Sequence, residues 1–166
     1  MELILPTLVF FVFGSILGSF LCVLVDRLPR GEQVISGRSK CESCHKVLTP
    51  LELIPVFSYI ALRGKCLKCH KRIPPHVFLV ETFGGLLSAS FFYYTFSTGI
   101  SIAQIVLLLL VFFALLGIFL TDVYSGIIPD EFVVAIIVLS FTLTLLFSPA
   151  SLIPLVTFSL SDFINN

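Results

Sequence analysis

The chain has 166 residues, of which 57% are hydrophobic, and its mean hydropathy is +1.09. That is too apolar for a soluble domain of this length, in which about half of the residues are usually apolar. The formal net charge is zero, but all ten Lys and Arg residues lie between Arg27 and Arg72, so we expect no nucleic-acid partner.

Four apolar stretches are long enough to form transmembrane helices. The first is a run of 23 residues without a charged side chain. A further stretch near the C-terminus is too short to cross a bilayer, and prolines interrupt it. We therefore expect an all-α polytopic membrane protein with about four transmembrane helices and a partial fifth; the stretches are Leu3–Val25, Val77–Phe96, Ile102–Leu120, Phe132–Phe147 and the partial Leu152–Leu160.

Small residues mark one face of the first predicted span. Gly14 and Gly18 form a G-x-x-x-G pattern, which lets two helix backbones approach closely. The alternative is that lipid simply tolerates small residues at these positions.

The basic residues predict the orientation. Cytoplasmic loops of membrane proteins carry an excess of Lys and Arg, and here a single loop holds them all. We expect the N-terminus outside and three parts: a first transmembrane helix (1–25), a cytoplasmic zinc-binding loop (26–76) and a transmembrane region (77–166). Counting spans from there brings Asp122, Asp130 and Glu131 out on the cytoplasmic side as well.

Two Cys-x-x-Cys pairs lie in the basic loop, separated by 21 residues. Each pair can form a tight knuckle, and two knuckles complete a tetrahedral zinc site with four thiolate ligands. A closed site of this kind folds a loop and does no chemistry, so we expect a structural zinc ion. The predicted ligands are Cys41, Cys44, Cys66 and Cys69.

A haem alternative exists because each pair is followed by His, as in c-type haem attachment. Such haems belong outside the cytoplasm, and beyond His45 and His70 the chain offers only His76 and Met1 as axial ligands. We therefore favour zinc and expect His45 and His70 at the surface or beside the ligands. The fifth cysteine, Cys22, is interpreted as a small buried residue of the first span.

Acidic residues at span ends are candidates for function, because they are costly unless they face water or a cavity. Asp122 closes a long apolar span; in the alternative interpretation it only marks the membrane interface. Glu81 lies just inside the second span. We expect it to pair with Lys71 or Arg72, or else to line a site beside Asp122.

Several motifs together resemble those of type IV prepilin peptidases. Gly18-Ser-Phe-Leu-Cys22, followed by Arg27-Leu-Pro-Arg-Gly31, resembles the N-terminal signature of that family. The two Cys pairs with their flanking residues resemble its cytoplasmic loop. Asp122-Val-Tyr-Ser-Gly-Ile-Ile-Pro-Asp130 resembles its D-x-x-x-x-x-I-P-D motif.

The resemblance implies a multi-pass aspartic endopeptidase of the bacterial inner membrane. Such enzymes cleave the leader from prepilins or pseudopilins at the cytoplasmic face, and many then methylate the new N-terminus with S-adenosylmethionine. The implied partners are a prepilin or pseudopilin and the lipid bilayer. Asp122 would be the first catalytic aspartate.

The sequence departs from the family in one respect that matters for catalysis. The second catalytic aspartate of the family lies in a G-x-G-D motif, and Asp162 has no such glycines around it. A peptidase that works with carboxylates needs two of them. We therefore expect a fragment or truncated homologue, or dependence on another chain. The alternative function is a catalytically inactive scaffold that binds a pilin.

Overall fold

The computed structural model describes residues 3–34, 38–41 and 43–147, and within them the fold is helical. Four helices are long and apolar enough to cross a membrane: α1 (Ile4–Arg27), α3 (Pro75–Thr95), α4 (Ile102–Ser125) and α5 (Asp130–Phe147). The prediction of an all-α fold with four spans is confirmed. The partial fifth span predicted at Leu152–Leu160 lies outside the described residues.

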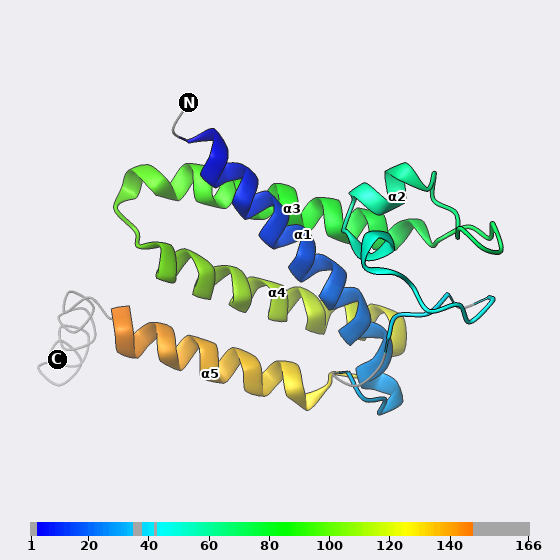
Figure 1. The fold of residues 1–166 in the computed structure, drawn as a ribbon. Coiled ribbons are helices and arrows are strands. Elements are labelled where there is room, and N and C mark those ends of the chain that lie inside the picture. The colour runs from blue at the N-terminus through cyan, green and yellow to red at the C-terminus, as the bar shows by residue number, and fades with distance from the viewer. Residues whose placement is uncertain (1–2, 35–37, 42, 148–166) are drawn as a thin grey trace, which may run out of the picture.

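Helices α3, α4 and α5 run alongside one another, α1 crosses obliquely, and the loop between α1 and α3 lies at one end of the helices (Figure 1). The ends of α1 and α4 and the beginnings of α3 and α5 meet at this same end. Residues from α1, the loop, α3 and the end of α4 also line one common cavity at this end, so the candidate functional residues of these segments lie close together.

Local signals fix both ends of α4. Ser101 accepts the backbone N–H of Gln104 at 3.3 Å, and Gln104 accepts the backbone N–H of Ser101 at 2.9 Å, a reciprocal cap that starts the helix. The helix ends before Gly126, whose φ of +63° suits glycine. This end lies beyond the predicted Leu120, so Asp122 belongs to the helix itself.

Helices α1 and α3 form the most extensive helix contact, as the G-x-x-x-G pattern predicts. Gly14 and Gly18 are both buried in it. A Cβ added to Gly18 would lie 2.8 Å from the carbonyl oxygen of Val80, and one added to Gly84 would lie 2.8 Å from that of Gly14. The helix backbones therefore touch, and larger residues would separate them.

Two apolar clusters complete the packing. In the first, the rings of Phe10 and Phe92 stack with their centroids 4.4 Å apart, against Ile105 and Leu109 of α4. The second cluster joins α1, α4 and α5 near the loop end, through Leu21, Phe113, Ala114 and Phe132.

The loop between α1 and α3 is made of short pieces. It contains 3₁₀ turns at Leu28–Arg30 and Pro50–Leu53 and a short helix, α2 (Phe57–Ala61). Val56, whose φ is +63°, separates the second 3₁₀ turn from α2.

Candidate functional site

The two Cys pairs form two knuckles with the same hydrogen bonds. In the first, the N–H of Cys41 donates to the carbonyl of Lys46 and the N–H of His45 to that of Cys41, both at 2.9 Å. In the second, the N–H of Cys66 donates to Lys71 and the N–H of His70 to Cys66, both at 3.0 Å. An isolated β-bridge closes each knuckle, Lys40 with Val47 and Lys65 with Arg72.

The His residue after each pair has a backbone role in these knuckles. His45 and His70 have φ values of +51° and +55°, and both side chains are exposed. Among residues other than glycine, His is one of those enriched in this left-handed region. The C-x-x-C-H pattern is thus explained by turn geometry, without haem attachment.

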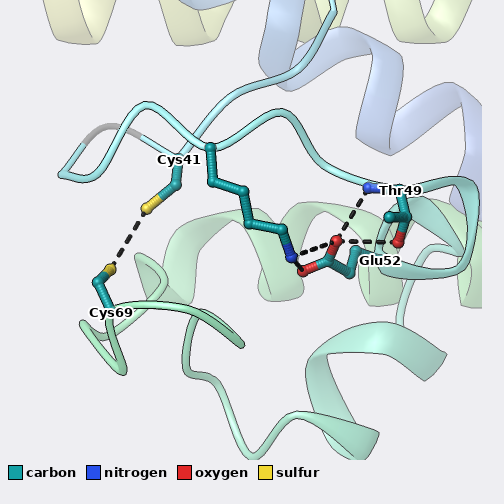
Figure 2. Close-up of polar contacts among 5 residues, drawn as sticks. Cys41, Thr49, Glu52 and Cys69 are labelled. Atoms are coloured by element: carbon teal, nitrogen blue, oxygen red, sulfur yellow. Dashed lines mark hydrogen bonds and ion pairs between the residues drawn. The ribbon is translucent and has the colours of Figure 1, made fainter.

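The knuckles face each other. The four sulfur atoms of Cys41, Cys44, Cys66 and Cys69 all lie within 4.8 Å of one another, so together they could hold a metal ion. Figure 2 shows Cys41 and Cys69 pointing toward each other across the gap, with their Sγ atoms 3.7 Å apart. Sulfurs about 2.3 Å from a tetrahedral zinc ion would lie about 3.8 Å apart. Convergence of both pairs on one point also argues against two separate haems.

Backbone N–H groups prepare the first sulfur of each pair for a metal. The N–H groups of Cys69 and Lys68 lower the pKa of Cys66 to about 6, and those of Cys44 and Ser43 lower the pKa of Cys41. These bonds stabilise the thiolate, which is the ligand form.

Cys69 differs from these two cysteines. Its sulfur receives the N–H of Lys71, but the loss of water on the side of the other cysteines and their neighbouring sulfurs outweigh that bond and raise its pKa to about 11. The four sulfurs can therefore all be thiolates at once only with a cation between them.

A polar cluster ties the first knuckle to the 3₁₀ turn after it. The ammonium group of Lys46 contacts both carboxylate oxygens of Glu52, at 2.9 and 3.0 Å. Glu52 also accepts the N–H and the hydroxyl of Thr49, each at 2.9 Å (Figure 2). The Thr49 backbone bond and the Lys46 bond hold the pKa of Glu52 at about 2, so this carboxylate is ionised at neutral pH.

A cavity of about 800 Å³ lies between the loop and the ends of the helices. Residues of the four-cysteine knuckles and of the membrane helices line this cavity together. Its lining includes Cys22 and Asp26 of α1, Cys41 and Cys66 of the knuckles, His76 and Glu81 of α3, and Leu120 and Tyr124 of α4.

Glu81 is buried, with 6% of its surface exposed, at the wall of this cavity. Its carboxylate accepts the backbone N–H of Val56 at 2.8 Å, which is a different partner from the expected Lys71 or Arg72. Sequence reasoning missed this contact, because a main-chain N–H leaves no signal in the sequence.

Asp122 lies in the last turn of α4 with its side chain exposed. Its neighbours Tyr124 and Ser125 line the cavity; among the described lining residues Asp122 is not included. Asp130 and Glu131 are exposed at the start of α5. The acids therefore gather at the α4–α5 junction, beside the cavity and outside its lining.

Comparison with known proteins places the chain in a family. Residues 12–95, half of the chain, match the sequence model of the bacterial peptidase A24 N-terminal domain. The prepilin leader peptidase/N-methyltransferase of Myxococcus xanthus is 39% identical over 77 residues, which are 46% of this chain and 23% of that protein. The protein of the same name from Bacillus subtilis is 44% identical over 52 residues, 31% of this chain and 21% of that protein.

The matched region thus spans less than a quarter of the length of either curated relative. No solved structure matches the chain. The region matched by the family model contains α1 from residue 12 onward, both cysteine knuckles and α3. The chain therefore belongs to the bacterial prepilin peptidase family.

Proposed function

We propose that this chain acts as a membrane aspartic endopeptidase. It would cleave the leader of type IV prepilins or pseudopilins at the cytoplasmic face, and would also methylate the new N-terminus with S-adenosylmethionine. The observation that carries the proposal is the family match over most of α1, the cysteine loop and α3. The names of both relatives combine the two activities.

The proposed setting is the bacterial inner membrane, with the N-terminus outside and the cysteine loop in the cytoplasm. The support is that every Lys and Arg residue lies in that loop or at its edges. The cavity would then open where a substrate helix leaves the bilayer.

Asp122 is the proposed catalytic aspartate. Its exposed carboxylate, one turn from the end of a membrane helix, is accessible to water and to a peptide at the membrane surface. In a two-carboxylate mechanism one group takes a proton from water while the other, protonated, polarises the scissile carbonyl. Asp122 supplies one of these groups, and the proposal requires a second carboxyl beside it.

Zinc is the proposed metal, held by all four cysteines. Their sulfur-only donor set and their mutual spacing suit tetrahedral zinc. With four protein ligands no coordination position is open, so the ion would stabilise the loop and take no part in cleavage.

Leader cleavage tests the proposal directly. Wild-type chain in membranes should shorten a prepilin substrate, Asp122→Asn should abolish cleavage, and Glu32→Gln, an exposed acid of the loop, outside the α4–α5 junction, should not change it. Cleavage by Asp122→Asn at the wild-type rate would refute the role of Asp122.

The alternative is a catalytically inactive scaffold that binds a pilin. It predicts that the wild-type chain co-purifies with the prepilin and never cleaves it.

A further inference from the structure

The loop contains a strained turn at Val56. The carbonyl of Pro55 accepts the N–H of Phe57 at 2.6 Å, which closes a three-residue turn around Val56. Val56 itself has φ +63° and ψ −53°. This form of the γ-turn is rare, and a positive φ is a genuine outlier for a β-branched residue. Something outside the turn must therefore hold it.

Glu81 of α3 is the group that holds it. Its carboxylate accepts the N–H of Val56 at 2.8 Å, and the side chain is nearly excluded from solvent. A hydrogen bond in a buried site is stronger than one at the surface, because the low dielectric of the interior strengthens it. The bond joins positions 25 residues apart, in the loop and in a membrane helix.

A second contact from the same face of α3 fixes α2. Phe78 lies one turn before Glu81 and stacks on Tyr59, with ring centroids 4.7 Å apart and an angle of 22° between the rings. The two contacts attach α2 to α3 on both sides of Phe57, so α2 has little freedom to pivot.

From α2 the connection continues into the second knuckle. Gly64 donates its N–H to the carbonyl of Tyr59 and accepts the N–H of Ile73, both at 2.8 Å. A Cβ on Gly64 would lie 2.9 Å from the ring of Tyr59. Gly64 and Ile73 flank the knuckle of Cys66 and Cys69, so the place of this knuckle follows from the place of α2.

We propose that Glu81 is a positioning residue that holds the four-cysteine loop over the cavity. By fixing the turn at Val56 it sets α2 and the second knuckle relative to the membrane helices, and so the shape of the cavity wall. Its effect on leader cleavage rests on the proposed function; its effect on the loop does not.

Amide hydrogen exchange on the zinc-loaded chain in nanodiscs tests the effect on the loop. In Glu81→Ala, the amides of Ser58 and Ile60 should exchange about 10- to 100-fold faster, the range expected when a buried donor loses its acceptor. Adding Val56→Gly should restore most of the protection, because glycine adopts the positive φ without strain. Glu81→Gln, which keeps an acceptor oxygen, should lie between wild type and Glu81→Ala.

The zinc content of Glu81→Ala shows whether Glu81 only positions the cysteine loop or is also needed for the loop to fold. It should stay at the wild-type value in Glu81→Ala, since each knuckle is closed by its own hydrogen bonds. Unchanged exchange in Glu81→Ala, or no rescue by Val56→Gly, would overturn the proposal. Loss of zinc together with protection throughout the loop would overturn it too, because Glu81 would then maintain the fold of the loop.

Leader cleavage completes the experiment. We expect Glu81→Ala to show both faster exchange and a kcat lowered at least tenfold. Adding Val56→Gly should then restore kcat. Faster exchange with wild-type kcat would refute the positioning role. If the wild-type chain does not cleave at all, the proposed function fails while the exchange results still decide the role of Glu81 in the loop.

Discussion

Replacing Gly18 by alanine should destabilise the contact between α1 and α3. The new Cβ would lie 2.8 Å from the carbonyl oxygen of Val80 and 3.1 Å from the Cα of Glu81. Ordinary contacts begin near 3.4 Å, so the first distance is about 0.6 Å too short. Both atoms belong to helix backbone, so the helices themselves must move apart. Overpacking of this kind costs about 1–3 kcal/mol.

The free energy of unfolding in mixed micelles, measured by denaturant titration and followed by circular dichroism, gives this cost. Val12→Ile is the matched control: it adds one methylene to the same helix at a position that is 55% exposed, and should change stability by less than about 0.5 kcal/mol. Equal stability of Gly18→Ala and Val12→Ile would show that α1 and α3 do not pack as described.

Three further predictions concern the loop. Cys66→Ser should lower bound zinc from one ion per chain, measured by elemental analysis, whereas Cys22→Ser should leave it at one, since Cys22 lies outside the four-sulfur cluster. His45→Gly and His70→Gly should keep zinc and stabilise the loop by up to about 1 kcal/mol. A residue with a Cβ in the left-handed region costs about 1–2 kcal/mol, and glycine removes this cost but loses part of the gain to its larger chain entropy in the unfolded state. Loss of zinc would identify the imidazoles as ligands. Because the pKa of Glu52 is depressed, the contribution of this carboxylate to stability is complete above pH 4.5 and is lost as the pH falls toward about 2. Carboxyl NMR should find the titration of Glu52 near pH 2. A midpoint near 4.5 would contradict the contacts of Glu52 with Lys46 and Thr49.

Features that depend on local sequence were predictable. The four spans follow from long apolar runs. The structure extends α4 past the predicted Leu120 to Ser125, where Gly126 ends it, and it moves the ends of the other spans by at most two residues. The convergence of the four cysteines follows from the spacing within and between the pairs. The Gly14 and Gly18 pattern predicted a close helix contact. Its partner Gly84 was not predicted, although Gly84 and Ser88 have the same spacing of small residues.

Features that depend on long-range contacts to backbone were not predictable. Charge alone suggested Lys71 or Arg72 as partners of Glu81, but the partner is the main-chain N–H of Val56. A β-branched residue gives no sequence signal for a positive φ, so the turn at Val56 was not predicted either. The catalytic role of Asp122 stays a prediction, and its carboxylate lies outside the lining of the cavity.

The self-closed knuckles have a consequence for how homologous loops can vary. The 21 residues between Cys44 and Cys66 influence metal affinity mainly through the entropy of bringing two preformed halves together. That entropy grows slowly, and doubling the length of the connection costs only about 0.6 kcal/mol. Insertions in this segment should therefore lower the metal affinity only slightly. A single residue added between Cys66 and Cys69 would instead disrupt the bond from His70 to Cys66 and with it one half of the site.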